Sequence, residues 1–196
     1  MGHQHLGRLP KTRNWQQVIR LISEGAAVNE VAAATSAAAE RQMGDASDDP
    51  AIRRAVWLLT QIPLAARQDD FGSELRRLGL PLGNSPTLLE GSAAFSAAID
   101  SRIVRTGGRT DLGEMAQLSA VESLNAIAGR ELPDFFGPEA ERAKVVLAGL
   151  ATVKQFAVLS RDFFSRLTHH LLLYFLSREL SLHVGPNSRF RSLREH

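Results

Sequence analysis

The chain has 196 residues, a formal net charge of +2 and no cysteine. The length is sufficient for one hydrophobic core. The missing cysteines exclude disulfide frameworks, thiolate zinc sites, iron–sulfur clusters and cysteine nucleophiles, and they permit a reducing compartment. The charged N-terminus does not resemble a secretory signal, and no stretch approaches the roughly 18 uncharged apolar residues of a membrane span. We therefore expect a cytoplasmic protein without membrane contact.

Nearly all of the 23 basic residues are arginine, since only Lys11, Lys144 and Lys154 are lysine. Arginine suits bidentate recognition of phosphate or carboxylate groups and desolvated interfaces. The joint richness in alanine, arginine, leucine and glycine also has a plainer interpretation, which is coding bias in a GC-rich bacterial genome. The net charge is too small to make the whole protein a binder of polyanions.

The first 14 residues are polar and lack periodicity, which predicts a basic flexible arm that carries Arg8, Lys11 and Arg13. Apolar residues then recur at helical spacing from Trp15. We expect Asn14 to cap this first helix at its N-terminus and Gly25 to end it.

The alanine-rich segment 28–43 predicts a second helix whose small side chains permit close packing. Together with the first helix it can be threaded as a helix-turn-helix. However, residues 37–39 are all alanine, where base recognition requires Arg, Asn or Gln. We therefore favour one continuous helix over specific DNA recognition.

Asp48 or Asp49 is expected to cap a helix that starts at Pro50 and runs to about residue 67, with Pro63 kinking or shortening it. Asp111 is expected to cap a later helix. The densest turn signal of the chain, at 79–86, marks a possible internal boundary. Further helices are predicted at 72–78, 87–104 and 111–129.

Beyond Pro138 we expect one long helix that reaches Gly185, because Gly149 in its interior costs only about 1 kcal/mol. Residues 171–176 are apolar around the whole helix circumference, so they should be covered on all sides, at the centre of the bundle or in a subunit interface. A basic tail, 187–196, follows with Arg189, Arg191 and Arg194. The expected buried stripe of the long helix is Val146, Leu150, Val153, Ala157, Ser160, Phe164, Leu167, Leu171 and Tyr174.

These patterns predict an all-α fold, a bundle of about six to seven helices around a long central C-terminal helix. Residues 15–186 are expected to form a single helical domain between the arm, 1–14, and the tail, 187–196. No run of alternating apolar and polar residues predicts a strand.

One motif suggests catalysis. Arg178-Glu-Leu-Ser-Leu-His183 resembles the spacing in helical ribonucleases of the HEPN type, where an Arg is followed after four to six residues by a His. Such a pair implies an Arg that steadies the scissile phosphate and a His that moves a proton. The spacing recurs between Arg189 or Arg191 and His196, and about two such spacings arise by chance from these residue frequencies. The alternative interpretation is a helix C-terminus that favours positive charge.

A set of polar and aromatic residues on the long helix predicts an interface with a partner, because polar groups close to a buried stripe must be paired. The alternative is that the arginine stems cover the core and place their charges in water. The predicted interface residues are Arg161, Phe164, Arg166, His170, Tyr174 and Arg178.

No metal site or cofactor is expected. His169 and His170 are adjacent, so their side chains point about 100° apart on a helix. Gly107-Gly108-Arg109 precedes a helix as phosphate cradles do, but Asp111 and Glu114 in its first turn would repel a phosphate. Motifs of P-loop ATPases, serine hydrolases of the α/β type and zincins are not found.

We therefore predict a noncatalytic helical adaptor or structural subunit that acts through contacts with a protein partner or with its own copies. The alternative is a nucleic-acid-associated protein. It would be either a nonspecific binder through Arg8, Lys11, Arg13, Arg189, Arg191 and Arg194, or a ribonuclease that uses Arg178 and His183. A third class, a sensor with an apolar pocket for a small molecule, would be stabilised by its ligand.

Overall fold

The computed structural model describes residues 12–45, 48–83, 86–106, 110–130 and 139–183. These residues form eight α-helices and no strand, which confirms the predicted all-α multi-helix bundle. Contacts divide the chain into two compact units, which we describe separately. Of the described residues, unit 1 contains 48–167, and unit 2 contains 12–45 and 168–183. The predicted boundary at 79–86 lies within unit 1, and cooperative folding of 15–186 as one domain stays a prediction.

Unit 2 begins with α1 (Arg13–Glu24), whose N-cap is Thr12 rather than the expected Asn14. The Thr12 hydroxyl accepts a hydrogen bond from the amide of Trp15 at 3.4 Å. Arg13 and Asn14 therefore belong to the first helical turn and not to an arm. As predicted, Gly25 ends the helix, with the left-handed φ of +69° that glycine adopts without strain.

The second helix of unit 2, α2 (Val28–Asp45), is continuous through the point where a helix-turn-helix would need its turn. The Thr35 hydroxyl donates to the Val31 carbonyl of the preceding turn at 2.6 Å, so it is satisfied within the helix. Ala38 and Ala39 are buried, consistent with the close packing of α1 on α2. The prediction of one continuous helix is confirmed.

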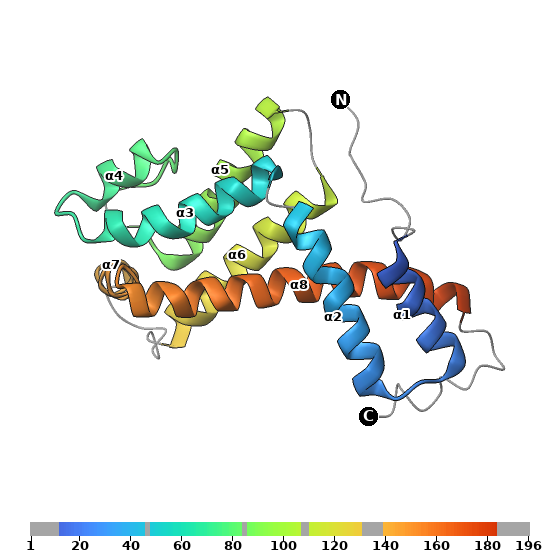
Figure 1. The fold of residues 1–196 in the computed structure, drawn as a ribbon. Helices are drawn as coiled ribbons and strands as arrows, with labels where there is room; N and C mark the ends of the chain where they lie inside the picture. The colour runs from blue at the N-terminus through green and yellow to red at the C-terminus, as the bar shows by residue number, and fades with distance from the viewer. Residues whose placement is uncertain (1–11, 46–47, 84–85, 107–109, 131–138, 184–196) are drawn as a thin grey trace. The chain divides into compact units, whose positions relative to one another are not determined.

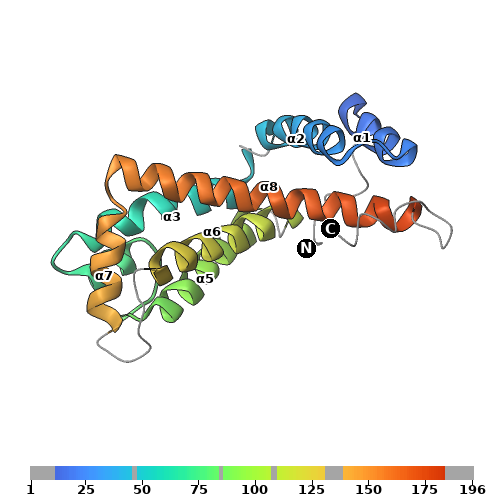
Figure 2. The same cartoon turned by 90° about the horizontal axis from the view of Figure 1, so that it is seen from below.

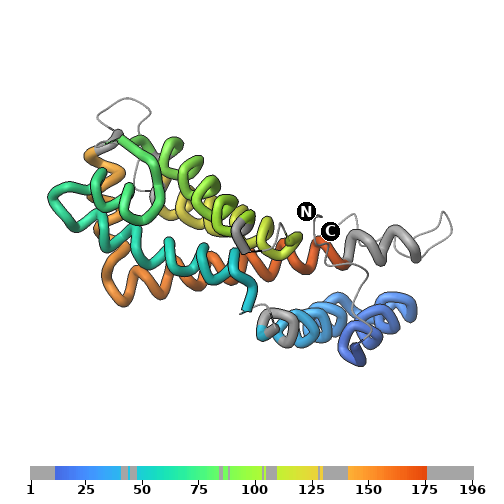
Figure 3. Tube along the Cα trace, turned by 90° about the horizontal axis from the view of Figure 1, so that it is seen from above, coloured from blue at the N-terminus to red at the C-terminus, as the bar shows by residue number. Residues whose placement is uncertain are grey.

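In unit 1, α3 (Pro50–Ala66) contacts four other helices: α4 (Phe71–Arg77), α5 (Leu88–Thr106), α6 (Asp111–Arg130) and α7 (Glu139–Gly149). Figures 2 and 3 show α5 beside α6 and α3 beside α5, respectively. Asp49 caps α3, as one of the two predicted caps, and accepts hydrogen bonds from the amides of Ala51 and Ile52 at 2.7 and 3.2 Å. Pro63 is buried, and the helix continues past it to Ala66.

The short helix α4 has well-defined ends. The Asp70 carboxylate accepts from the amide of Ser73 at 3.0 Å and caps the N-terminus. At the other end Gly79 has a φ of +83°, and the amide of Leu80 donates to the Leu75 carbonyl at 2.9 Å. This pattern is a Schellman motif, which turns the chain sharply away from the helix.

Thr110, and not the expected Asp111, caps α6. The Thr110 hydroxyl accepts from the amide of Gly113 at 2.8 Å and donates to the Asp49 carboxylate at 2.9 Å. Asp111 is therefore the first residue of the helix and not its N-cap. The Thr110–Asp49 bond therefore links the N-termini of α6 and α3.

The prediction of one long helix beyond residue 138 is wrong, because the chain turns by 95° between α7 and α8 (Val153–His183). Figure 1 shows α7 almost end-on beside the start of α8. α7 ends at Gly149, which favours a helix end by its conformational freedom. The Thr152 hydroxyl and carbonyl then accept from the amides of Gln155 and Phe156, at 3.3 and 2.8 Å, and start a new helix.

In the part of α8 that belongs to unit 1, the expected buried stripe is right at Leu167 but wrong at Val153 and Phe164. The buried residues there are Leu159, Phe163 and Leu167, whereas Val153 is 90% exposed and Phe164 43% exposed. Both faces of this helix carry apolar residues, so the periodicity fits either of them. The packing of unit 1 selects the face with the larger side chains at every fourth position.

In unit 2, α8 buries Leu171 and Phe175. The Phe175 ring packs against the ring of Trp15 from α1, with a centroid distance of 5.2 Å. Leu173, however, is 51% exposed, so the chain's own helices do not cover 171–176 on all sides. Cover by a subunit interface stays a prediction. Leu176 lies outside the described side chains.

Taken one at a time, none of the described helices combines the length and the apolar character that crossing a membrane requires. Only α7 and α8, taken together across their bend, pass the same test.

Candidate functional site

Three of the predicted interface residues lie on the part of α8 that belongs to unit 1. Arg161 is exposed, and the partly exposed Phe164 ring packs edge-on against Phe163 at 5.0 Å. Arg166 instead forms ion pairs within the unit, with Asp162 at 2.7 Å and Glu122 of α6 at 3.4 Å. The hydrogen bond to Asp162 raises the pKa of Arg166. Its carboxylate partners thus come from its own chain.

The remaining predicted residues of α8 lie in unit 2. His170 and Tyr174 are half-buried, with their rings beside His169 and Phe175 at centroid distances of 6.0 and 5.3 Å. The side chains of Arg178 and His183 lie outside the described residues, so their pairing and a ribonuclease role stay predictions.

Of the six residues predicted to contact nucleic acid, the structure describes only Arg13. Arg13 is exposed at the start of α1. The other five lie outside the described residues: Arg8, Lys11, Arg189, Arg191 and Arg194. Within the described part of the chain, no group of three or more His, Asp or Glu residues could hold a metal ion.

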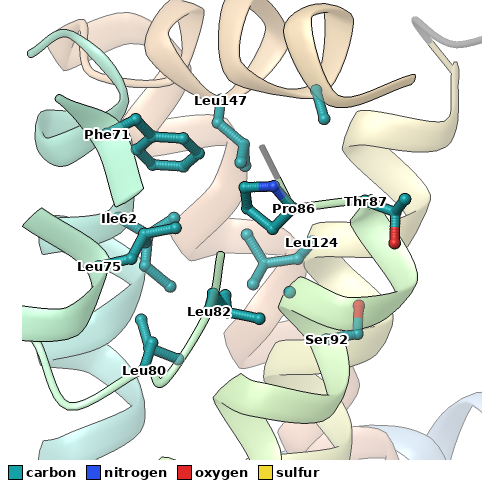
Figure 4. Close-up of a pocket in the computed structure, with 12 residues that line it drawn as sticks. Ile62, Phe71, Leu75, Leu80, Leu82, Pro86, Thr87, Ser92, Leu124 and Leu147 are labelled. Atoms are coloured by element: carbon teal, nitrogen blue, oxygen red, sulfur yellow. The ribbon is translucent and has the colours of Figure 1, made fainter. Parts of the chain in front are cut away.

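Unit 1 encloses a small apolar cavity of about 40 Å³ between α3, α4, α5, α6 and α7 (Figure 4). Its two polar side chains have partners outside the cavity: Ser92 donates to Asn125 at 2.8 Å, and Thr87 donates to Glu90 at 3.0 Å. Sites for small molecules usually measure about 300–1,000 Å³. This cavity is therefore too small for the ligand of the sensor hypothesis.

A larger polar cleft of about 750 Å³ lies on unit 1 where α3, α5 and the turn after α4 meet. We call it the arginine cleft, because Arg53 and Arg54 of α3 and Arg102 of α5 line it. Trp57, one turn further along α3, contributes a ring that is 41% exposed. The other lining residues are Asp48, Pro50, Gly79, Ala98 and Ser101.

Two contacts hold Arg54 in place, and Gly79 leaves room for it. Its Nη2 donates to the Leu78 carbonyl at the C-terminus of α4, at 2.5 Å. Its guanidinium lies 4.4 Å from the centroid of the Trp57 ring, in a cation–π contact. A Cβ on Gly79 would lie 3.2 Å from Nη2, so the absence of a side chain there leaves room for the guanidinium.

Arginines outnumber acids among the described residues that line the cleft. Burial, and secondly the charge of Arg102, lower the pKa of Arg54, although an arginine stays protonated at neutral pH. Asp48 is the only acid among the lining residues that the structure describes. The neighbouring Asp49 already accepts hydrogen bonds from Ala51, Ile52 and Thr110. Three arginines and one aspartate are therefore among the described residues that line the cleft.

The arginine cleft combines arginine and tryptophan side chains. Among its described residues there is no histidine, and Asp48 is the one carboxylate. Arginine and tryptophan are instead the residues that carry most of the affinity at protein interfaces.

Sequence reasoning missed this cleft. The spacing of Arg53, Arg54 and Trp57 on one helix was a usable signal, because residues three and four apart share a helix face. Arg102 could not be added from the sequence, since it comes from another helix. Comparison of the chain with protein-family models, curated proteins and solved structures finds no match.

Proposed function

We propose that the protein is a noncatalytic adaptor or structural subunit, and that its arginine cleft binds an acidic segment of a partner protein. One observation carries this proposal: three arginines, a partly exposed tryptophan and a single aspartate are the charged and aromatic residues among the described lining of one cleft. Such a surface combines an aromatic anchor with charges that steer and orient an acidic partner.

The outer face of α3 extends the same chemistry beyond the cleft. Arg53, Trp57, Leu64 and Arg67 follow one another at helical spacing, and Leu64 is 46% exposed. The face thus places two apolar anchors between two positive charges. An amphipathic helix whose acidic residues flank apolar ones is complementary to it.

The cellular compartment and the assembly in which the protein works are part of the same proposal. The composition and the absence of cysteine support a bacterial, cytoplasmic protein that works in a larger assembly or oligomer. Arg161 and Phe164 of α8, two of the predicted interface residues, are exposed, and we include them in the proposed contact surface of unit 1.

Fluorescence anisotropy with two labelled peptides tests the proposal on the full chain. One peptide forms an amphipathic helix of leucine and glutamate, and the other has lysine in place of glutamate. We expect only the glutamate peptide to bind, with an affinity that falls as salt is raised. Arg53→Glu and Trp57→Ala should each weaken binding by about tenfold or more. The matched control is Arg142→Glu, an exposed charge reversal on α7 outside the cleft.

Equal binding of both peptides, or equal effects of Arg53→Glu and Arg142→Glu, would contradict the proposal.

The second candidate function is binding of single-stranded nucleic acid, because the Trp57 ring beside arginines could also stack a base. An RNA oligonucleotide that binds with a steep salt dependence, while neither peptide binds, would favour it. Its ribonuclease version predicts RNA cleavage that His183→Ala abolishes.

A further inference from the structure

The outer face of α3 carries five side chains at the spacing of a helix–helix contact. Intervals of four, three, four and three residues separate them, which is the heptad pattern that keeps residues on one stripe. We call this set the α3 stripe: Arg53, Trp57, Thr60, Leu64 and Arg67. Because Arg53 and Trp57 also line the arginine cleft, the stripe leads from the cleft toward the C-terminus of the helix.

The helix α3 packs on its own unit through other positions and leaves the stripe exposed or partly exposed. It contacts α4 to α7, and its buried residues include Leu59, Ile62 and Ala66. By helical periodicity these positions lie on the side opposite to the stripe. Thr60, the neutral polar member of the stripe, donates to the Trp57 carbonyl at 2.6 Å, so its hydroxyl stays satisfied when a partner covers it.

The stripe has one arginine at each end of its apolar residues, and both guanidinium groups are open to a partner. Neither Arg53 nor Arg67 has an ion pair or a side-chain hydrogen bond within the described part of the chain. Arg77 and Arg166, in contrast, pair with carboxylates of unit 1 at 2.6 and 2.7 Å. Asp49, one turn before Arg53, is already engaged as the cap of α3. The stripe therefore favours an acidic group at each of its ends.

The separation of the two ends selects the kind of partner. Fourteen residues lie between the positions of Arg53 and Arg67, and at a helical rise of about 1.5 Å per residue this is about 21 Å along α3. We infer that the partner segment is one continuous helix of about four turns, which packs lengthwise on the α3 stripe and places one acidic residue near each arginine. This inference rests on the proposed function and names the pattern of the partner helix. Its two acids are fourteen positions apart, and apolar residues at heptad positions between them cover Trp57 and Leu64.

The test is fluorescence anisotropy of the full chain with two labelled peptides of the same length and composition. Both are alanine-rich helices of about 18 residues with leucine at heptad positions, and their two glutamates lie either fourteen or seven positions apart. We expect the peptide with the wider spacing to bind about two- to fivefold tighter. The other peptide reaches only one arginine at a time, and one exposed ion pair contributes about this factor.

Double-mutant cycles assign the two ends of the stripe. Arg53→Gln and Arg67→Gln are each combined with a peptide in which one of the two glutamates is replaced by glutamine. We expect Arg53 to couple to one glutamate and Arg67 to the other, whichever way the partner helix runs. Arg142→Gln on α7, at an exposed arginine outside the stripe, should couple to neither.

The apolar middle of the stripe has its own matched pair of variants. Leu64→Ala should weaken the peptide with the wider spacing about fivefold or more, because the partner then buries less apolar area. Val145→Ala on α7 should leave the affinity unchanged, although Val145 is 70% exposed and Leu64 only 46%. Circular dichroism checks that each variant keeps its helix content.

Each remaining outcome overturns a stated part of the reasoning. Equal affinities for the two spacings would refute the two-ended contact, and so would coupling of both arginines to the same glutamate or to none. The adaptor proposal would then still stand if the leucine–glutamate peptide binds and Arg53→Glu weakens it. Failure of every peptide to bind would refute the inference and the proposed function together.

Discussion

Replacing Gly79 with alanine tests whether the turn after α4 positions Arg54 in the cleft. Gly79 has a φ of +83°, where an L-residue costs about 1–2 kcal/mol. The new Cβ would also lie 3.2 Å from Nη2 of Arg54, so the guanidinium must move away by a few tenths of an ångström. This movement weakens a charged hydrogen bond to Leu78, of the kind that contributes about 1.5–3 kcal/mol.

We therefore expect Gly79→Ala to lower the free energy of unfolding by about 2–4 kcal/mol, with strain and the weakened bond both contributing. Gly25→Ala is the matched control. Gly25 has a similar φ of +69°, but a Cβ there would have no neighbour within 4 Å. It should lose only the strain, about 1–2 kcal/mol.

Urea unfolding followed by circular dichroism measures both losses, and Trp57 and Trp15 fluorescence follows units 1 and 2 separately. The affinity for the glutamate peptide should fall in Gly79→Ala and stay constant in Gly25→Ala. If both variants lose the same stability and both keep full affinity, Gly79 does not position Arg54, and the reasoning is refuted.

Three further predictions concern the core and the caps. Phe163→Ala should lower the unfolding free energy by about 3–5 kcal/mol, whereas Phe164→Ala, at a partly exposed site, should cost far less; equal losses in denaturant unfolding would contradict the observed face of α8. Ser123→Ala should leave the unfolding free energy unchanged or raise it by about 1 kcal/mol, because the buried Ser123 hydroxyl has no hydrogen-bond partner in the described part of the chain; a clear loss would reveal one. Hydrogen bonds from the side chain and then the backbone of Ser73 lower the pKa of Asp70, so its contribution to stability is complete at neutral pH and is lost as the pH falls below about 4. Asp70→Asn should therefore flatten the acid limb of a plot of stability against pH, and an unchanged acid limb would count against this role of the cap.

Short-range signals in the sequence determined most of the helices and several of their ends. Gly25 ends α1, and Asp49 before Pro50 starts α3, because caps act within a few residues of the chain. The choice between adjacent candidates was less secure. The observed N-caps are Thr12 and Thr110, and not the expected Asn14 and Asp111. Asn14 instead bonds to Ala37, and Thr110 also bonds to Asp49. Both bonds form only when helices distant in the sequence meet.

Only the tertiary structure decided the bend after Gly149, the buried face of α8 and the arginine cleft. Leu159 and Phe163 on one face of α8, and Val153 and Phe164 on the other, are all apolar, so periodicity alone cannot tell which face the bundle covers. The cleft needs Arg102 of α5 beside the arginines of α3. Helical periodicity relates residues within one helix, whereas the pairing of two helices depends on how their side chains fill space together.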